Sequence, residues 1–216
     1  RHLVRSRGLG DVYKRQHQGD IRFYQGNGEG FTEVFFNIDN GVNETKGIAW
    51  VDLDNDSDLD FFITNRLGPN QVWVNDNMTF TDVSATCGID QSNNTRSYGM
   101  SFADYNNDGY VDFYICNYHT WIDATENELY LNNGDGTFSD VIKESGLFKD
   151  RMIVTTGVSS ADINKDGYID LLVTTIASQD NQTKKKKTLS PNLLYINNGD
   201  GTFTDVSLKF GLTKNN

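Results

Sequence analysis

Oxygen-bearing side chains recur in three nine-residue segments, each flanked by apolar residues. The segments are Asp52–Asp60, Asp104–Asp112 and Asp162–Asp170. Each carries oxygen-bearing side chains at positions 1, 3, 5 and 9 and a turn residue at position 6. Carboxylates gathered in one place repel each other unless a cation lies among them, and ligands that are all oxygen suit a hard divalent ion. The spacing therefore predicts up to three cation sites, and the flexible geometry of such a loop favours Ca²⁺ over Mg²⁺.

The position of each residue in the loop gives its expected role as a ligand. Positions 1, 3, 5 and 9 offer side-chain oxygens, and position 7 offers its backbone carbonyl. The candidate metal ligands are Asp52, Asp54, Asp56, Asp58 and Asp60 in the first copy, Asp104, Asn106, Asp108, Tyr110 and Asp112 in the second, and Asp162, Asn164, Asp166, Tyr168 and Asp170 in the third. At position 6 the first copy has Ser57 where the others have Gly109 and Gly167. A serine at positive φ costs on the order of 1 kcal/mol, which the extra acid of the first loop can offset.

An ordinary surface turn is the alternative interpretation of one such loop, because Asp, Asn and Gly dominate turns. Three copies in one register favour the metal site, since each copy ends in an aspartate that opens an apolar strand. An EF-hand does not fit, because its loop needs a glutamate at position 12 and flanking helices.

The elements that must position these loops repeat with a period of roughly 50–65 residues. Each unit has a small-residue strand, the acidic loop, an apolar strand and a hairpin. The expected first strands are 47–51, 99–103 and 157–161, the second strands 59–64, 111–116 and 169–174, and the hairpins 71–83, 128–141 and 193–206. Asp-Gly within 132–138 and 197–203 is a strong hairpin signal. The segments 82–89, 140–147 and 205–212 that follow are expected to form one helical turn each.

Four strands with apolar residues facing both ways cannot bury themselves alone, but radial stacking buries them. The predicted fold is therefore all-β, a fragment of a β-propeller with three complete four-stranded blades and part of another. A β-solenoid is the alternative. Residues 17–46 are assigned to the partial blade, whose hairpin includes 23–31, and 47–98, 99–156 and 157–216 to the complete blades.

Residues 1–16 match none of the repeats and are basic where the remaining chain is acidic. Asp11–Gln16 resembles the translation of a transposon-end adapter used to prepare sequencing libraries. We interpret 1–16 as a non-native segment, with a native basic tail as the alternative, and expect Tyr13 to lie outside the core.

Composition limits the classes of partner. A net charge of −11 over 216 residues argues against nucleic acid, which needs concentrated Lys and Arg. The apolar content of 37% with only 2 prolines fits a folded all-β protein, and no apolar run has the length of a membrane span. Cys87 and Cys116 are interpreted as free thiols, with a disulfide as the alternative.

No catalytic constellation is visible in the sequence. There is no nucleophile elbow and no HExxH motif, and the paired carboxylates belong to the acidic loops. The glycines of 26–30 fit a hairpin better than a phosphate loop, since a strand and not a helix is expected after them. Any ligand contacts are expected in the inserts 117–127, with His119 and Trp121, and 178–192, with Lys184–Lys187. His119 and Trp121 are interpreted as incidental residues of an exposed loop, with contact to a ligand as the alternative. The lysine run is interpreted as a solvated loop, with contact to an acidic partner as the alternative.

The pattern Gly-Ile-Ala-Trp-Val-Asp of 47–52, continued by the acidic loop and by hairpins such as Leu-Tyr-x-Asn-Asn-Gly-Asp-Gly-Thr-Phe, resembles FG-GAP/VCBS repeats. These repeats build integrin-α-type β-propellers, and the repeat sequence is similar to that of the ASPIC/UnbV (cartilage acidic protein-like) group. The resemblance covers about residues 20–212 and implies Ca²⁺ in the acidic loops, with partners bound elsewhere. Ser57 and the hairpin of 75–80, which lacks glycine, depart from the pattern.

Together these features predict a calcium-stabilised extracellular, periplasmic or cell-surface β-propeller that serves as a binding or adhesion module for protein or glycan. Its other partners are the remaining blades of the same chain. The alternative is a polysaccharide-active lyase or hydrolase whose catalytic residues lie in the missing blades, and a third is a structural spacer.

Overall fold

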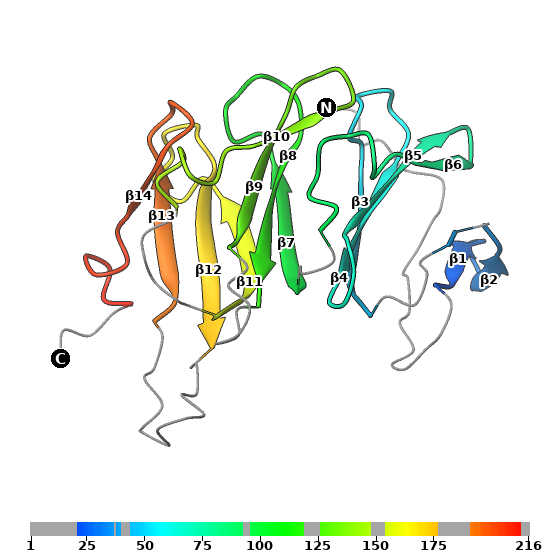
Figure 1. Cartoon of the computed structure of the whole chain (residues 1–216), viewed down its shortest axis with the longest axis horizontal. Coiled ribbons are helices and arrows are strands. Elements are labelled where there is room, and N and C mark those ends of the chain that lie inside the picture. Colours follow the sequence, from blue (N-terminus) through cyan, green and yellow to red (C-terminus); the bar gives the residue numbers. More distant parts are fainter. Residues whose placement is uncertain are drawn as a thin grey trace. The chain divides into compact units, whose positions relative to one another are not determined.

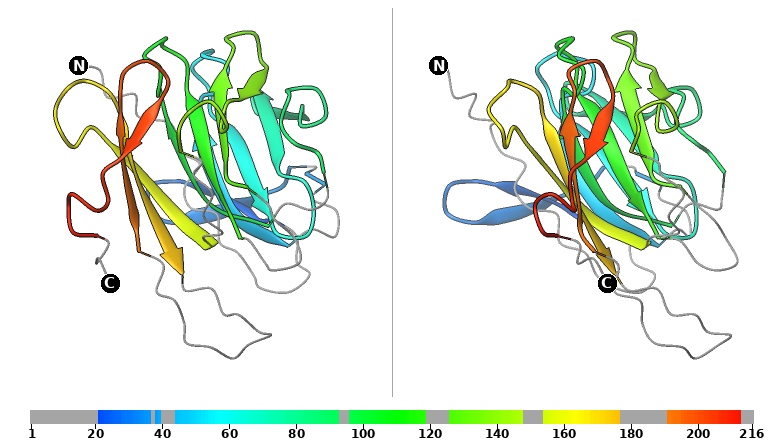
Figure 2. Two further views of the ribbon diagram at one scale, coloured as in Figure 1. Left: turned by 60° about the vertical axis from the view of Figure 1, so that its left-hand side comes forward. Right: turned by 90° about the vertical axis from the view of Figure 1, so that its left-hand side faces the viewer.

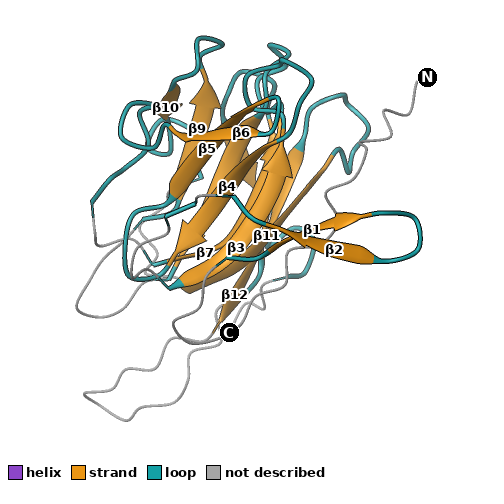
Figure 3. Ribbon diagram, turned by 90° about the vertical axis from the view of Figure 1, so that its right-hand side faces the viewer, coloured by secondary structure: helices purple, strands orange, loops and turns teal. Residues whose placement is uncertain are grey.

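A computed structural model describes residues 21–36, 38–39, 44–92, 96–118, 126–147, 154–176 and 191–212. Every regular element in these ranges is a β-strand, which confirms the all-β prediction (Figure 3). No described segment forms a helix long and apolar enough to cross a membrane. Residues 1–16, with Tyr13, lie outside the described residues. The chain divides into two compact units, residues 1–44 and 45–216.

The smaller unit contains one antiparallel hairpin. Its strands are β1 (Phe23–Gly26) and β2 (Phe31–Val34), and Phe23 pairs with Val34. The Asn27 side chain shapes the turn, because its Oδ1 accepts the backbone N–H of Gly30 at 2.8 Å. A strand follows the glycine-rich turn, so the hairpin interpretation of this segment is confirmed.

The larger unit consists of three four-stranded antiparallel sheets, whose strands pair in chain order. The first blade contains β3 (Thr45–Val51), β4 (Asp60–Asn65), β5 (Gln71–Asp76) and β6 (Thr79–Asp82). The second contains β7 (Ser97–Ala103), β8 (Asp112–Asn117), β9 (Glu128–Asn132) and β10 (Phe138–Asp140). The third contains β11 (Val154–Ala161), β12 (Asp170–Ile176), β13 (Leu193–Asn197) and β14 (Phe203–Asp205). The sheets lie side by side (Figures 1 and 2), as expected of propeller blades and unlike the parallel strands of a β-solenoid.

The hydrophobic core lies between the blades. One cluster joins the first and second blades, where the rings of Phe62 and Phe113 are 4.9 Å apart. A second cluster joins the second and third blades around Tyr105 and Leu171. Each cluster draws on two successive sheets, so a single blade has no complete core of its own. Both cysteines are buried and free, which confirms the interpretation as thiols.

Glycine allows the second blade to approach the segment that follows the first. The Phe138 N–H donates to the Cys87 carbonyl oxygen at 2.7 Å, and a Cβ on Gly88 would lie 2.5 Å from the Phe138 carbonyl oxygen. Gly88 also has a φ of 90°. The predicted helical turn here is a single hydrogen-bonded turn, in which the Cys87 N–H donates to Val83 at 2.9 Å.

The outer face of the third blade exposes apolar side chains that the other blades bury. Ile163 is 50% exposed, whereas Tyr105, at the same place in the second acidic loop, is 1% exposed. Leu172 is likewise 39% exposed, whereas its counterpart Tyr114 is 1% exposed. This face therefore has the composition of a blade interface.

Candidate metal centre

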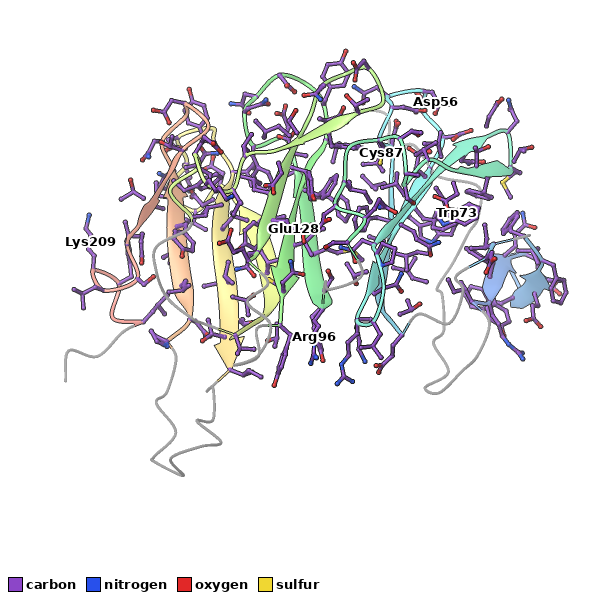
Figure 4. The ribbon with its side chains drawn as sticks, viewed as in Figure 1. Asp56, Trp73, Cys87, Arg96, Glu128 and Lys209 are labelled. Atoms are coloured by element: carbon purple, nitrogen blue, oxygen red, sulfur yellow. The ribbon has the colours of Figure 1, made fainter. Side chains whose placement is uncertain are left out.

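The three acidic loops connect the first two strands of each blade, β3 to β4, β7 to β8 and β11 to β12. They lie at one end of the larger unit (Figure 1). In Figure 4, Asp56 marks this end, and Arg96 lies at the opposite one. All candidate ligands therefore come from one edge of the sheets.

Each loop bends twice through the left-handed region. Position 6 has positive φ in every copy, at 78° for Ser57, 93° for Gly109 and 92° for Gly167. Position 4 also has positive φ, at 62° for Asn55, 59° for Asn107 and 65° for Lys165. The second bend was not predicted, although an asparagine in two of the copies is a signal for it.

The aspartate at position 1 closes the loop onto the bend. Asp52 Oδ2 accepts the N–H of Ser57 at 3.1 Å, and Asp104 Oδ2 accepts the N–H of Gly109 at 2.9 Å. Asp162 makes the same bond with Gly167 at 3.0 Å. The turn at position 6 therefore holds this carboxylate against the loop backbone.

The aspartate at position 9 is buried and joins the loop to the hairpin of its own blade. Asp60 Oδ2 accepts the N–H of Leu53 at 2.7 Å, and its Oδ1 accepts the N–H of Asn75 at 2.9 Å. Burial outweighs these bonds and raises the pKa of Asp60 to about 6. In the second blade burial likewise raises the pKa of Asp112 to about 6. Asp170 has equivalent backbone partners, at 3.0 Å from Ile163 and 2.9 Å from Asn197.

Position 3 distinguishes the first loop from the other two. Asn106 Nδ2 donates to Asp108 Oδ2 at 2.7 Å, and Asn164 Nδ2 donates to Asp166 Oδ2 at 2.7 Å. The first loop has Asp54 there, whose side chain has no N–H to offer. Asp54 is exposed as a residue, but partial desolvation within the loop, followed by repulsion from Asp56, raises its pKa. The first loop therefore lacks the side-chain N–H donor that, in the second and third loops, satisfies a carboxylate oxygen of the loop.

Carboxylate oxygens of Asp52, Asp54 and Asp60 lie within 4.8 Å of one another. Asp52 Oδ1 and Asp58 Oδ1 are buried and have no hydrogen-bond partner within the described ranges. Buried carboxylate oxygens without a donor are costly, and a cation can satisfy them. The first loop thus brings together an oxygen-only cluster that could hold a metal ion.

The side chain at position 7 faces the hairpin turn of the same blade. A Cβ on Gly134 would lie 2.7 Å from the Tyr110 ring, and one on Gly199 would lie 2.5 Å from the Tyr168 ring. In the first blade, Asp58 Oδ2 instead accepts the N–H of Asn77 at 3.1 Å. The loop without a tyrosine thus faces the hairpin without a glycine, so two departures from the repeat pattern compensate each other.

Neighbouring loops are joined by asparagine side chains that were not predicted as functional. Asn132 Nδ2 donates to the Leu53 carbonyl oxygen at 2.7 Å, and Asn197 Nδ2 donates to that of Tyr105 at 2.8 Å. Both asparagines open the Asn-Asn-Gly-Asp-Gly hairpin motif, which is the sequence signal that could have found them. Of the predicted inserts, residues 119–125 and 178–190, with His119, Trp121 and Lys184–Lys187, lie outside the described part of the chain.

Comparison with known proteins agrees with this geometry. The profile of the FG-GAP-like repeat matches residues 52–115 and 117–173. Cartilage acidic protein 1 of Mus musculus is 30% identical over 136 residues, which cover 61% of this chain and 20% of that protein. Cartilage acidic protein 1 of Xenopus tropicalis is 30% identical over 134 residues, again 61% of this chain and 20% of that protein. The matched segment is thus a fifth of the length of these relatives. The chain belongs to the FG-GAP-like repeat family.

Proposed function

We propose that this chain is part of a calcium-stabilised extracellular β-propeller that serves as a binding or adhesion module for protein or glycan. The observation that carries the metal assignment is the first loop, where carboxylate oxygens of Asp52, Asp54 and Asp60 lie within 4.8 Å of one another and the buried Asp52 Oδ1 lacks a donor. Ca²⁺ takes six to eight oxygen ligands in flexible geometry, which suits a loop of carboxylates and a backbone carbonyl.

In this proposal, positions 1, 3, 5 and 9 hold Ca²⁺ through side chains and position 7 holds it through its carbonyl. Bound Ca²⁺ supplies positive charge that relieves repulsion among the carboxylates. Asp60 keeps free lone pairs although it accepts two N–H groups, because each carboxylate oxygen can accept twice. Since Asp60 also holds the N–H of Asn75, ordering the loop orders the hairpin of the same blade.

Two further observations support the module and its location. Loops of this kind suit an affinity of roughly 10⁻⁴–10⁻³ M, which matches calcium outside the cell and not in the cytosol. The 30% identity to segments of cartilage acidic protein 1 from two species supports a matrix or cell-surface role. We further propose that another blade of the same protein covers the exposed face of the third blade.

No described residue favours the enzymatic alternative. Glu128 is the acid with the most unusual surroundings outside the loops, and burial raises its pKa to about 7. Its carboxylate is enclosed by Asn117 and Tyr130 inside the second blade. The hydrogen bonds of Glu128 are therefore made within the second blade.

The test of calcium binding is the melting temperature of the chain in excess EGTA and in 10 mM CaCl₂. At 100 times the dissociation constant, one site adds about 2.7 kcal/mol to the free energy of unfolding. We expect EGTA to lower the melting temperature by several degrees and added Ca²⁺ to restore it. Asp54→Asn gives the first loop the donor of the other two, so this variant should lose less stability in EGTA. Equal melting temperatures in both buffers would contradict the proposal.

A further inference from the structure

We infer that the three acidic loops bind Ca²⁺ as a coupled array, in which Asn132 and Asn197 are positioning residues. This inference rests on the proposed calcium binding. It concerns the residues that join one loop to the next, and it states that an occupied loop raises the affinity of its neighbour.

The hydrogen bonds that connect the first loop to the second begin at Leu53. The Leu53 N–H donates to Asp60 Oδ2 at 2.7 Å, so the proposed ligand at position 9 holds this residue in place. The carbonyl of the same residue accepts Asn132 Nδ2 at 2.7 Å. Leu53, Asp60 and Asn132 are all buried, so water does not replace either bond readily.

The backbone of Asn132 forms the hydrogen bond to the second loop. Its N–H donates to Asp112 Oδ1 at 2.9 Å, so one asparagine contacts one loop through its side chain and the other through its main chain. Three hydrogen bonds therefore lead from the buried carboxylate of the first loop to that of the second.

The same connection continues from the second loop to the third. The Tyr105 N–H donates to Asp112 Oδ2 at 2.8 Å, and the Tyr105 carbonyl accepts Asn197 Nδ2 at 2.8 Å. The Asn197 N–H then donates to Asp170 Oδ1 at 2.9 Å. A repeated arrangement at two interfaces indicates a property of the repeat and not an isolated contact.

An exposed contact runs parallel to the buried one. Asn55 Nδ2, at position 4 of the first loop, donates to the Gly109 carbonyl at 3.1 Å. Asn107 Nδ2 donates to the Gly167 carbonyl at 3.3 Å in the same way. Position 4 of the third loop is Lys165, whose side chain has no amide with which to repeat this contact.

The sign of the coupling follows from the cost of ordering. A loop must be ordered around its cation, and that cost falls on the first loop to bind. Asn132 fixes Leu53 relative to Asp112. Ordering one loop therefore also partly orders its neighbour, and the free-energy cost of ordering the neighbour when it binds Ca²⁺ is smaller. Repulsion between cations does not reverse the effect, since the aspartates of each loop, even with Lys165 in the third, leave no loop with a net positive charge when one Ca²⁺ is bound.

The test disables the first loop and measures the others. Asp54 and Asp56 are exposed ligands outside the buried connection, so Asp54→Ala with Asp56→Ala removes one site and leaves Asp60 in place. Calorimetric titration of the full chain with CaCl₂ then gives the affinity of the remaining sites. We expect these sites to weaken on the order of fivefold, the lower end of typical allosteric coupling. In an Asn132→Ala background, the same double substitution should weaken them less, because only the exposed contact of Asn55 then joins the first two loops.

Asn75→Ala is the matched control. Asn75 donates to Leu59 of its own blade and accepts the N–H of Met78, as Asn132 does with Val111 and Gly134. In the described part of the chain it reaches no neighbouring acidic loop. Asn75→Ala should therefore keep the fivefold effect, and equal loss of coupling in both variants would overturn the role of Asn132.

A second pair of variants covers the case in which Asn132→Ala does not fold. Asn55→Ala removes the exposed contact and should reduce the coupling, whereas Lys165→Ala at the same loop position should not. If disabling the first loop leaves the other affinities unchanged, the coupling is wrong while calcium binding stands. If the unaltered chain takes up no Ca²⁺, the proposed function itself fails.

Discussion

Glu128 is a buried acidic residue of the second blade (Figure 4). Its Oε1 accepts Asn117 Nδ2 at 2.7 Å, and Asn117 Oδ1 accepts Ser97 Oγ at 2.7 Å. Asn70 Nδ2 of the first blade donates to the same Ser97 hydroxyl at 2.9 Å. A buried polar network thus joins two blades and ends on a carboxylate. Burial outweighs the hydrogen bonds from Asn117 and Tyr130 and raises the pKa of Glu128 to about 7.

This pKa predicts a dependence of stability on pH. The folded pKa lies above the ordinary value of 4.5, so the folded chain holds the proton between these values while the unfolded chain has released it. Stability contributed by Glu128 is therefore lost as pH rises from 4.5 to 7. Gln71 stands at the same register in the first blade, opposite Ile63 as Glu128 is opposite Ile115, so a glutamine fits there.

Glu128→Gln should raise the melting temperature at pH 8 by several degrees and change it little at pH 4.5. The comparison is made in saturating CaCl₂, because under the proposal the metal keeps Asp60 and Asp112 ionised throughout. Melting curves recorded by circular dichroism at both pH values check this. Parallel pH profiles for the two proteins would contradict the assignment.

At the scale of the element, each acidic loop and its hairpin form one unit. Tyr110 lies over Gly134, and Tyr168 lies over Gly199, whereas the first blade pairs Asp58 with Asn77. The loop spacing predicted the strands within a few residues, since position 9 opens β4, β8 and β12. The contact between the side chain at position 7 and the hairpin turn could not be predicted from the sequence. It depends on how closely the tyrosine ring approaches the turn in three dimensions.

Gly134→Asn tests this unit. Asparagine tolerates the φ of 74° at this position, so most of the loss should come from its Cβ against the Tyr110 ring. We expect a loss of about 1–3 kcal/mol in the free energy of unfolding, measured by urea denaturation. In a Tyr110→Ala background, Gly134→Asn should lower the free energy of unfolding much less than it does in the unaltered chain.

Gly136→Asn is the control in the same hairpin. Gly136 has a φ of 82°, and a Cβ there would meet nothing within 4 Å. Its substitution should therefore cost only the backbone preference, a few tenths of a kcal/mol to about 1 kcal/mol. Similar losses at both glycines, or a loss at Gly134 that is independent of Tyr110, would refute the contact.

At the scale of the whole molecule, stability comes from the interfaces between blades. The repeat period predicted four-stranded units and radial stacking, but not the groups that meet. Asn132 and its acceptor Leu53 are 79 residues apart in the sequence, so local patterns cannot pair them. The same holds for the N–H of Phe138, which donates to Cys87, and for the close approach at Gly88.

Gly88→Ala and Gly211→Ala form a matched pair for these interfaces. Both glycines follow a hairpin and have positive φ, at 90° and 72°. A Cβ on Gly88 would lie 2.5 Å from the Phe138 carbonyl oxygen, whereas one on Gly211 would meet nothing within 4 Å. Gly211→Ala should cost about 1 kcal/mol for the backbone alone. Gly88→Ala should cost about 1–3 kcal/mol more in urea unfolding, and equal losses would argue against a tight interface.

The asparagine that reaches back to the preceding blade and the loop carbonyl that receives the next one belong to the same repeat. In the second blade these are Asn132, which donates to Leu53, and Tyr105, which accepts from Asn197. One stretch of gene thus encodes both halves of an interface, a donor facing one neighbour and an acceptor facing the other. Duplication of that stretch copies both halves together. A blade added in this way fits its neighbours before any further mutation, so the repeat can multiply in evolution without a new interface being invented.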